Sequence, residues 1–330
     1  TFYQMVTMFD ISVDQYFYMK QKITMKTSKN LTVGEAVELF FRKAAVKNLS
    51  KDTLNTYRGH LNAFCRYIDK DMRISALTDE SVDGFILYLK ETTKASDIII
   101  NTYLRTVRSF LYYSMDCGYL RRFKVVMPKV EKKIKPTYTD EELSRLLQKP
   151  RLNQCSFSEY RIWVFENYLL GTGSRLSSAL NVRIGDIDFD NGTILLWTAK
   201  NRRPQLLPLT RTLAGILKEY LEKRGGAADD YLFCNIYGEK GKRSTFQQEV
   251  SRYNIQRNVN KTSCHLFRHT FAKKWVLSGG DIFRLQKILG HSDITVTREY
   301  VNMFSPDLQR DFERFNPLDQ IGMNTVRIKM

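Results

Sequence analysis

A basic stretch interrupted by proline constrains the fold of this chain more than any other feature. Between residues 121 and 135, seven lysines and arginines are opposed by a single acidic residue, Glu131. Pro128 and Pro136 disfavour a helix here, because proline lacks the backbone N–H and fixes φ. Such a stretch cannot form the interior of a domain, so we expect the 330 residues to fold as two units on either side of it.

The residues before this stretch carry the signals of four helices. Thr32 and Glu35 form a capping-box pattern ahead of an apolar run. Ser50 and Thr78 stand where the N-caps of a second and a third helix are expected, each before apolar residues at helical spacing. A fourth helix is predicted over residues 97–117, where a glycine follows. Four short helices with one apolar face each predict a small helical bundle.

The residues after the basic stretch begin with further helices. Thr139 and Glu142 form another capping box, and a longer helix that follows is predicted to end at Gly171. Another helix begins near Arg175, and the free backbone amides of such a helix start favour an anion nearby.

A short antiparallel sheet is predicted next. The sequence Asp190-Asn191-Gly192 is a hairpin-turn signal before a run rich in β-formers at residues 193–198. Residues 200–204 then turn the chain into a second strand at residues 205–209. Lys200 is therefore predicted to lie on a hairpin that can swing in and out of a site. Most of the remaining chain is predicted to be helical.

Six residues of the second unit form an ordered set that could hold and attack a phosphodiester. Among 18 tyrosines and many cations, no single member would be informative, but three of the four histidines of the chain fall in these segments. The set consists of Arg175 in Thr172-Gly173-Ser174-Arg175, then Lys200, His265 and Arg268 in His265-Leu266-Phe267-Arg268-His269-Thr270, His291 in Leu289-Gly290-His291, and Tyr300.

Attack on a phosphodiester calls for these residue types. The pentacoordinate intermediate carries extra negative charge on its non-bridging oxygens, and fixed donors aimed at that charge stabilise it. Arg175 and Arg268 suit a clamp, because a guanidinium donates two parallel hydrogen bonds and stays protonated. His265 could hydrogen-bond the phosphate and pass a proton, with His291 as a second donor.

The other two members of the set suit the bond that breaks and the bond that forms. Lys200 could protonate the leaving deoxyribose oxygen, because the pKa of a lysine shifts readily in a site. Tyr300 would form a covalent phosphotyrosine, which keeps the bond energy for rejoining. This reaction needs no metal, no ATP and no other cofactor.

His265 and His269 also have the i, i+4 spacing of a helical zinc pair. Leu266 stands where the glutamate of an H-E-x-x-H site would be, and Cys264 has no second cysteine at metal spacing nearby. We therefore discount zinc and interpret His269 as a structural hydrogen-bonding residue.

At these segments the chain resembles the tyrosine recombinase (phage integrase) family. The resemblance is strong from about Thr139 to Tyr300 and looser over the preceding helices. It rests on the combination of H-x-x-R-H-T, L-G-H and the tyrosine, since the T-G-x-R segment alone would be weak. It implies a SAM-like core-binding domain followed by an α+β catalytic domain with a small antiparallel sheet. It also implies that the residues that activate the phosphate for attack by Tyr300 are Arg175, Lys200, His265, Arg268 and His291.

The chain departs from the family pattern at two positions. Ser178 stands three residues after the first arginine, where an acid that supports the site is usual. Phe267 stands where leucine is common, which is an exchange between apolar residues. All six chemical positions are filled, so we expect an active enzyme.

These observations together predict a mainly α-helical, multidomain protein. The expected segments are an N-terminal arm or packed helix over residues 1–30, a helical core-binding domain over 31–120, a basic linker over 121–138, a catalytic domain over 139–318, and a tail over 319–330 that either docks on a neighbouring subunit or frays.

The net charge of +17 and the pI near 9.6 predict a polyanionic partner. No stretch approaches the roughly 20 apolar residues of a membrane span, and no signal peptide is evident, so DNA is the expected partner. Five scattered cysteines indicate reduced thiols and a cytoplasmic, nucleoid-associated protein. Any one cation could equally belong to a solvated face. The candidate DNA contacts are Lys43, Lys47, Lys51, Arg58, Arg105, Arg108, Arg121, Arg122, Lys129, Lys132, Lys133, Arg202 and Arg203.

The predicted function is site-specific DNA recombination of the integrase or transposase type, and the host element, whether a phage, a transposon or a chromosome-dimer system, stays open. The resemblance implies exchange through a Holliday junction by a homotetramer on double-stranded recombination sites, with accessory DNA-bending factors. Two alternatives stay open. A type IB topoisomerase shares the chemistry but rejoins the same strand, although such enzymes commonly have lysine where His265 stands. A DNA-binding accessory protein without catalysis would form no covalent complex.

Overall fold

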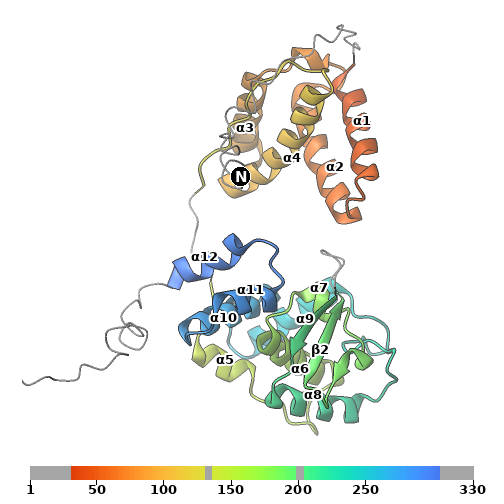
Figure 1. The fold of residues 1–330 in the computed structure, drawn as a ribbon, viewed down its shortest axis with the longest axis vertical. Helices are drawn as coiled ribbons and strands as arrows, with labels where there is room; N and C mark the ends of the chain where they lie inside the picture. The colour runs from red at the N-terminus through yellow and green to blue at the C-terminus, as the bar shows by residue number, and fades with distance from the viewer. Residues whose placement is uncertain (1–30, 131–135, 198–203, 305–330) are drawn as a thin grey trace, which may run out of the picture. The chain divides into compact units, whose positions relative to one another are not determined.

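The computed structural model describes residues 31–130, 136–197 and 204–304 (Figure 1). Contacts divide the chain into two compact units, of which one ends at Lys132 and the other begins at Lys133. Some predictions therefore concern residues outside the described ranges. They are the arm over 1–30, the tail over 319–330, Lys132, Lys133, Lys200, Arg202 and Arg203.

The first unit contains the four predicted helices, with a short 3-10 turn at Ile74–Ala76. The helices are α1 (Val33–Val46), α2 (Lys51–Ile68), α3 (Asp79–Thr93) and α4 (Asp97–Asp116).

Local capping signals account for where these helices begin. The Glu35 amide donates to the Thr32 hydroxyl at 3.2 Å, and the Thr32 amide donates to the Glu35 carboxylate at 2.9 Å, which completes the predicted capping box. Ser50 caps α2 by accepting from the Thr53 amide, and Thr78 is the N-cap residue of α3. The apolar faces of the four helices then share one core that is rich in phenylalanine.

The first part of the predicted linker packs on this helical unit. Residues 119–130 form neither helix nor strand, yet Leu120 and Val125 are buried in the same core as the four helices. The side-chain amide of Asn101 donates to the Pro128 carbonyl at 2.9 Å. These contacts tie the start of the basic stretch to the helical unit as far as Pro128.

The second unit places a small sheet and a set of helices around one long central helix (Figure 1). Its elements are α5 (Asp140–Leu146), α6 (Phe157–Thr172), α7 (Leu176–Ala179), a 3-10 turn (Ile184–Asp186), β1 (Ile187–Asp188), β2 (Thr193–Trp197), β3 (Pro204–Pro208), α8 (Arg211–Arg224), α9 (Arg243–Gln256), α10 (Cys264–Leu277), α11 (Ile282–Leu289) and α12 (Ile294–Phe304).

The sheet is antiparallel with the order β1-β2-β3, and Leu195 pairs with Leu206. Ile194, Leu196 and Leu207 are buried, whereas Trp197 and Leu206 on the other face are exposed, so one face packs on the core. The hairpin-turn signal and the existence of both predicted strands are confirmed, but β3 begins and ends one residue earlier than predicted, at Pro204 and Pro208.

Helix α6 passes through the centre of the unit and is buried on several sides, against α8, α9 and α10. The prediction that it ends at Gly171 was wrong, because the helix continues to Thr172. Gly173 is the residue that adopts the left-handed conformation, with φ of 62°. A Cβ atom on Gly173 would lie 2.7 Å from the Phe271 ring and 3.0 Å from Leu289, so glycine also allows the close approach of α10 and α11.

Candidate active site

Arg268 is the central cation of the site. It lies on α10 with only 2 % of its surface exposed. Its guanidinium donates to the Gly173 carbonyl at 2.9 Å and to the Leu289 carbonyl at 2.7 Å. These carbonyls lie at the C-terminal ends of α6 and α11, where the helix dipole is negative, so two helix ends offset the buried charge. Burial lowers the pKa of Arg268 to about 10, and Arg175 lowers it as well, so the side chain remains charged at neutral pH.

Arg175, the other predicted clamp arginine, lies beside Arg268. It is the N-cap residue of the short helix α7, half-buried, and it donates to the same Leu289 carbonyl at 3.3 Å. Burial lowers the pKa of Arg175. The carbonyl of Leu289 therefore receives hydrogen bonds from both predicted clamp arginines, and Gly290 follows it in the left-handed conformation, with φ of 59°.

His291 is held between Arg268 and α12. Its Nε2 lies 2.7 Å from the Arg268 guanidinium, and its Nδ1 lies 2.8 Å from the Thr297 hydroxyl. A guanidinium only donates, so Nε2 accepts, and the ring proton of a neutral His291 is on Nδ1, where it donates to Thr297. In this arrangement Nε2 is not a donor. The predicted donation to a phosphate needs either a second proton on the ring or release of Arg268.

Tyr300, the predicted nucleophile, is also covered, with 2 % of its surface exposed. Its hydroxyl lies 2.7 Å from Nδ1 of His269. Burial raises the pKa of Tyr300, the charges of Arg268 and Arg175 lower it, and Glu299 raises it, with a net increase. The hydroxyl is therefore a neutral phenol at neutral pH. It lies near both arginines but is shielded from solvent.

His265 lies at the exposed beginning of α10. Its ring packs edge-on against His269, with centroids 4.4 Å apart and planes at 80°. The structure thus brings His265, His269 and Tyr300 into one sequence of neighbouring rings. Of the other predicted site residues, Lys200 lies outside the described residues. Strand β3, which follows it, contacts the end of α11, because the side-chain amide of Gln205 donates to the Ile288 carbonyl at 2.8 Å.

Two residues of the site were not predicted for the roles that the structure gives them. His269 was expected to be a structural hydrogen-bonding residue; it makes a hydrogen bond, but its partner, the hydroxyl of the proposed nucleophile, was not predicted. Thr297 is fully buried and orients His291. One signal in the sequence pointed to it, since Thr297 stands one helical turn before Tyr300 and so shares a face with it. Ser178, the departure from the family pattern, is buried on α7.

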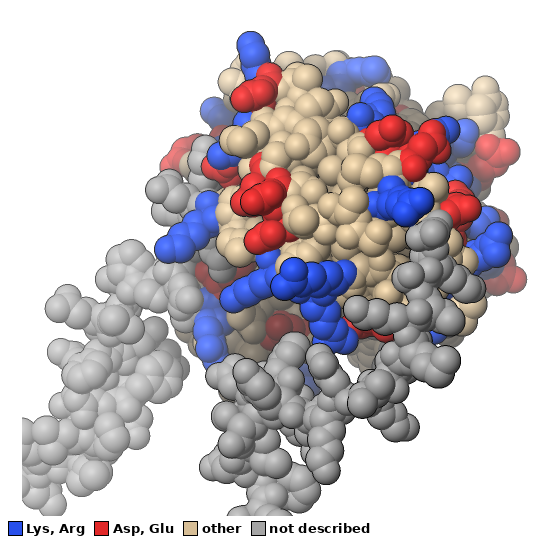
Figure 2. Space-filling model, turned by 90° about the horizontal axis from the view of Figure 1, so that it is seen from above, with Lys and Arg blue, Asp and Glu red and all other residues tan. Residues whose placement is uncertain are grey.

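The candidate DNA contacts of the first unit are mostly solvent-exposed. On the face shown in Figure 2, lysines and arginines are interspersed with acidic side chains, so that face does not carry a single sign of charge. Arg122 pairs with Asp116 at 3.1 Å, and the Arg58 guanidinium lies over the Phe41 ring. The exposed candidates are Lys43, Lys47, Lys51, Arg58, Arg105, Arg121, Arg122 and Lys129, and Arg108 is half-buried.

Two further properties hold for the described part of the chain. It contains no group of three or more His, Cys, Asp or Glu side chains arranged to hold a metal ion. None of its helices combines the length and the apolar character that crossing a membrane requires.

Comparison with known proteins agrees with this geometry. The model of the phage integrase family matches residues 137–305, and the model of the phage integrase SAM-like domain matches residues 37–132. This chain belongs to the phage integrase family. The family match and the described architecture confirm the predicted fold class, a helical SAM-like domain followed by an α+β domain with a small antiparallel sheet.

Curated relatives cover most of the chain. Tyrosine recombinase XerC of Roseiflexus sp. (strain RS-1) is 28 % identical over 82 % of this chain and 90 % of its own length. Tyrosine recombinase XerD of Staphylococcus haemolyticus (strain JCSC1435) is 26 % identical over 82 % of this chain and 94 % of its own length.

Solved structures share the fold at lower identity. The Tn1549 transposon integrase in complex with transposon right-end DNA matches with a TM-score of 0.70 and 20 % identity, over 86 % of this chain and 99 % of that one. A lambda integrase dimer bound to a COC′ core site matches with a TM-score of 0.65 and 15 % identity, over 81 % and 97 % of the two chains.

Proposed function

We propose that this protein is a site-specific DNA recombinase that cleaves and rejoins strands through a 3′-phosphotyrosine at Tyr300. The proposal rests mainly on one observation. Arg175 and Arg268 both donate to the Leu289 carbonyl, and His291 contacts Arg268. The Tyr300 hydroxyl lies near these groups and is hydrogen-bonded to His269. The family match and the relatives named tyrosine recombinases support the same chemistry.

The reaction exchanges one phosphodiester for another. The Tyr300 oxygen attacks the phosphorus, the bond to the 5′-oxygen breaks, and the chain with the free 5′-hydroxyl leaves. His269 accepts the phenolic proton, because its Nδ1 is within hydrogen-bond distance of the hydroxyl. Lys200 gives a proton to the leaving oxygen. Arg175 and Arg268 stabilise the charge that develops on the non-bridging oxygens.

The described arrangement is a closed one. Arg268 and Tyr300 are each 2 % exposed, and Arg268 donates to two carbonyls and to His291. A phosphate can reach them only after local rearrangement. We infer that DNA binding uncovers Tyr300 and replaces His291 as the partner of Arg268. His291 can then take a second proton and donate to the phosphate, as the sequence predicts.

The assembly and the DNA contacts belong to the same proposal. We infer a homotetramer on double-stranded recombination sites, with accessory DNA-bending factors and two rounds of exchange through a Holliday junction. The exposed cations of the helical unit would contact the DNA backbone, which positions a protein without specifying sequence.

A nicked suicide substrate tests the proposal. Footprinting on candidate attachment sequences first defines the DNA site, and a nick near the cleavage point then traps the covalent intermediate. The proposal predicts a protein–DNA adduct on a denaturing gel, and strand exchange between two intact sites. Relaxation of supercoils without exchange would instead favour a topoisomerase, and binding without any adduct would favour an accessory protein.

A further inference from the structure

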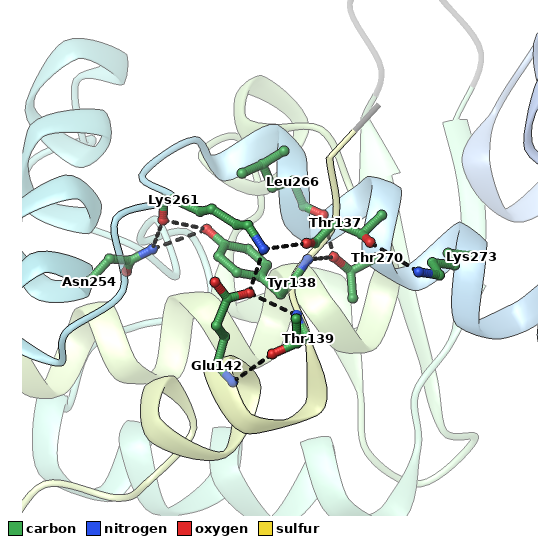
Figure 3. Close-up of polar contacts among 9 residues, drawn as sticks. All are labelled: Thr137, Tyr138, Thr139, Glu142, Asn254, Lys261, Leu266, Thr270 and Lys273. Atoms are coloured by element: carbon green, nitrogen blue, oxygen red, sulfur yellow. Dashed lines mark hydrogen bonds and ion pairs between the residues drawn. The ribbon is translucent and has the colours of Figure 1, made fainter. Parts of the chain in front are cut away.

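The residues that begin the second unit run along α10, the helix that carries Arg268 and His269 (Figure 3). The backbone N–H of Tyr138 donates to the Thr270 hydroxyl at 2.9 Å, and the same hydroxyl donates to the Leu266 carbonyl at 2.8 Å. Thr270 is fully buried and follows His269 directly in sequence. A single hydroxyl thus joins this segment to α10 at the turn that carries the catalytic residues.

The Tyr138 side chain holds α10 at a second point. Its hydroxyl donates to the Lys261 carbonyl at 3.1 Å, just before α10, and accepts from the Asn254 amide at 3.0 Å. Its ring packs on the Phe267 ring with centroids 4.6 Å apart. Tyr138 therefore contacts both the segment just before α10, at Lys261, and the turn of α10 that contains Thr270.

Lys261 closes the arrangement. Its ammonium group donates to the Thr137 carbonyl at 2.8 Å and to the Glu142 carboxylate at 2.7 Å (Figure 3). The same carboxylate accepts from the Thr139 amide at 2.8 Å within the capping box of α5. We call the group Thr137, Tyr138, Glu142, Lys261 and Thr270 the α10 clasp.

The site requires a defined position of α10. Arg268 donates to carbonyls at the ends of two other helices, to Gly173 of α6 at 2.9 Å and to Leu289 of α11 at 2.7 Å. A small rotation or shift of α10 would lengthen both bonds and move His269 relative to Tyr300. A displacement of about 1 Å in a reacting group can cost about 100-fold in rate.

We propose that Thr270 and Tyr138 are positioning residues for strand cleavage, which act by holding α10 so that Arg268 and His269 face the reacting phosphate. This inference rests on the proposed function and adds two buried residues to it. It assigns a role in the reaction to the segment where the chain enters the catalytic unit.

Thr270→Val tests the proposal, because it keeps the side-chain volume and removes only the hydroxyl. At saturating DNA, we expect the single-turnover rate of adduct formation on the suicide substrate to fall about 10- to 100-fold. The Kd for DNA should stay within about twofold, since binding comes mainly from phosphate contacts elsewhere. Thr270→Ser restores the hydroxyl and should recover most of the rate.

Thr210→Val is the matched control. It removes a threonine hydroxyl that accepts a backbone N–H, from Leu213 at 3.3 Å, at the N-cap of α8 in the same unit. It should lower thermal stability without slowing adduct formation. Tyr138→Phe removes only the hydrogen bonds of the hydroxyl to Lys261 and Asn254, so it should slow cleavage less than Thr270→Val. Its adduct-formation rate tests the proposal if Thr270→Val does not fold.

The outcomes separate the two proposals. Adduct formation by Thr270→Val and Tyr138→Phe at the wild-type rate would overturn the clasp and leave the recombinase function intact. Equal slowing by Thr210→Val and Thr270→Val would also overturn it, because general destabilisation would then explain both. A wild-type protein that forms no adduct on the same DNA would overturn the proposed function, and the clasp with it.

Discussion

The arginines and the tyrosine of the site are held by two different kinds of structure. Arg268 lies on α10, which packs on α6. Helix α6 is buried on several sides and forms the centre of the main core of the unit. Tyr300 lies on α12 and belongs to a separate cluster whose buried members are Ala272, Leu285, Leu289 and Tyr300. Arg268 thus lies on a helix of the main core, whereas Tyr300, the proposed nucleophile, is itself one of the side chains that pack α12 against the unit.

This difference implies a division of labour. A preorganised cation costs no reorganisation at the moment of reaction, so the arginines benefit from a rigid frame. Two side-chain hydrogen bonds, one between Tyr300 and His269 and one from His291 to Thr297, join α12 to the rest of the unit. Bonds of this kind contribute about 0.5–1.5 kcal/mol each, an amount that DNA binding can readily offset. We therefore propose that Tyr300 is released for the reaction while Arg175 and Arg268 stay in place.

The largest expected effect comes from Tyr300→Phe. The ring still fills the small cluster, so α12 should stay docked, but the attacking oxygen is absent. We expect DNA binding within about twofold of wild type and no covalent adduct, a loss of at least about 1,000-fold in cleavage. Binding and denaturing gels on the suicide substrate measure both. An adduct formed by this variant would move the nucleophile to another residue.

Arg268→Ala should come next, with cleavage about 100- to 1,000-fold slower and a much smaller change in DNA affinity. It also removes the Arg268 donor from the Gly173 carbonyl and leaves the Leu289 carbonyl with only the longer bond from Arg175, so the unit should lose stability. Arg175→Ala is the comparison, because that side chain is only half-buried and should cost cleavage with less stability. Single-turnover kinetics and thermal unfolding test this, and equal losses of affinity and cleavage would contradict it.

Glu166 allows a test of how well the core around α6 excludes water. It is fully buried on α6, and in the described part of the chain neither of its carboxylate oxygens has a hydrogen-bond partner. Burial raises the pKa of Glu166 well above its usual range, although Arg257 lowers it, so burial favours the protonated, neutral carboxyl. The folded state then binds a proton that the unfolded state loses above its ordinary pKa. The stability from this group is complete at low pH and declines as the pH rises towards the raised pKa.

Glu166→Gln removes that titration. We expect the free energy of unfolding of the wild type to fall with pH more steeply than that of Glu166→Gln, by at most about 1.4 kcal/mol per pH unit. Urea denaturation between pH 5 and pH 8 measures the two slopes. Parallel slopes would mean that Glu166 is ionised in the folded state. Water would then reach this carboxylate in the core around α6, despite its burial.

The smallest expected effect is on the local stability of α12, which the hydrogen bond from His291 to Thr297 helps to hold in place. Thr297→Val removes the hydroxyl that accepts from His291 and keeps the side-chain volume. Amide hydrogen exchange over residues 294–300 should accelerate about two- to tenfold, whereas exchange in α6 should not change. Thr297→Ser is the control and should behave as wild type. Faster exchange in both helices would show that they belong to one cooperative unit and would remove the contrast.

Much of the fold could be predicted because its signals are local. The capping boxes at Thr32 and Thr139 and the turn at Asp190-Asn191-Gly192 each depend on residues a few positions apart, and the structure contains all three. The end of α6 could not be placed in this way. Gly171 and Gly173 are equivalent as local stop signals, and the choice depends on Phe271 and Leu289, which pack against Gly173 from other helices.

The site shows the same limit. Spacing identified the residue types, and the structure brings Arg175, Arg268, His291 and Tyr300 together. The pairings of His269 with Tyr300 and of Tyr138 with Thr270 join segments 31 and 132 residues apart. Such pairings depend on how helices pack, which no local pattern encodes. The buried position of Tyr300 was not predictable either, because a tyrosine in a helical pattern carries no sign of whether its hydroxyl is covered.

Peptide mapping of the trapped intermediate tests the central claim most directly. Trypsin should release residues 299–310, a peptide whose single tyrosine is Tyr300. After nuclease digestion of the adduct, mass spectrometry should find a phosphodeoxynucleotide on this peptide, attached to Tyr300. A nucleotide on any other peptide, or on Ser305 of this one, would contradict the account.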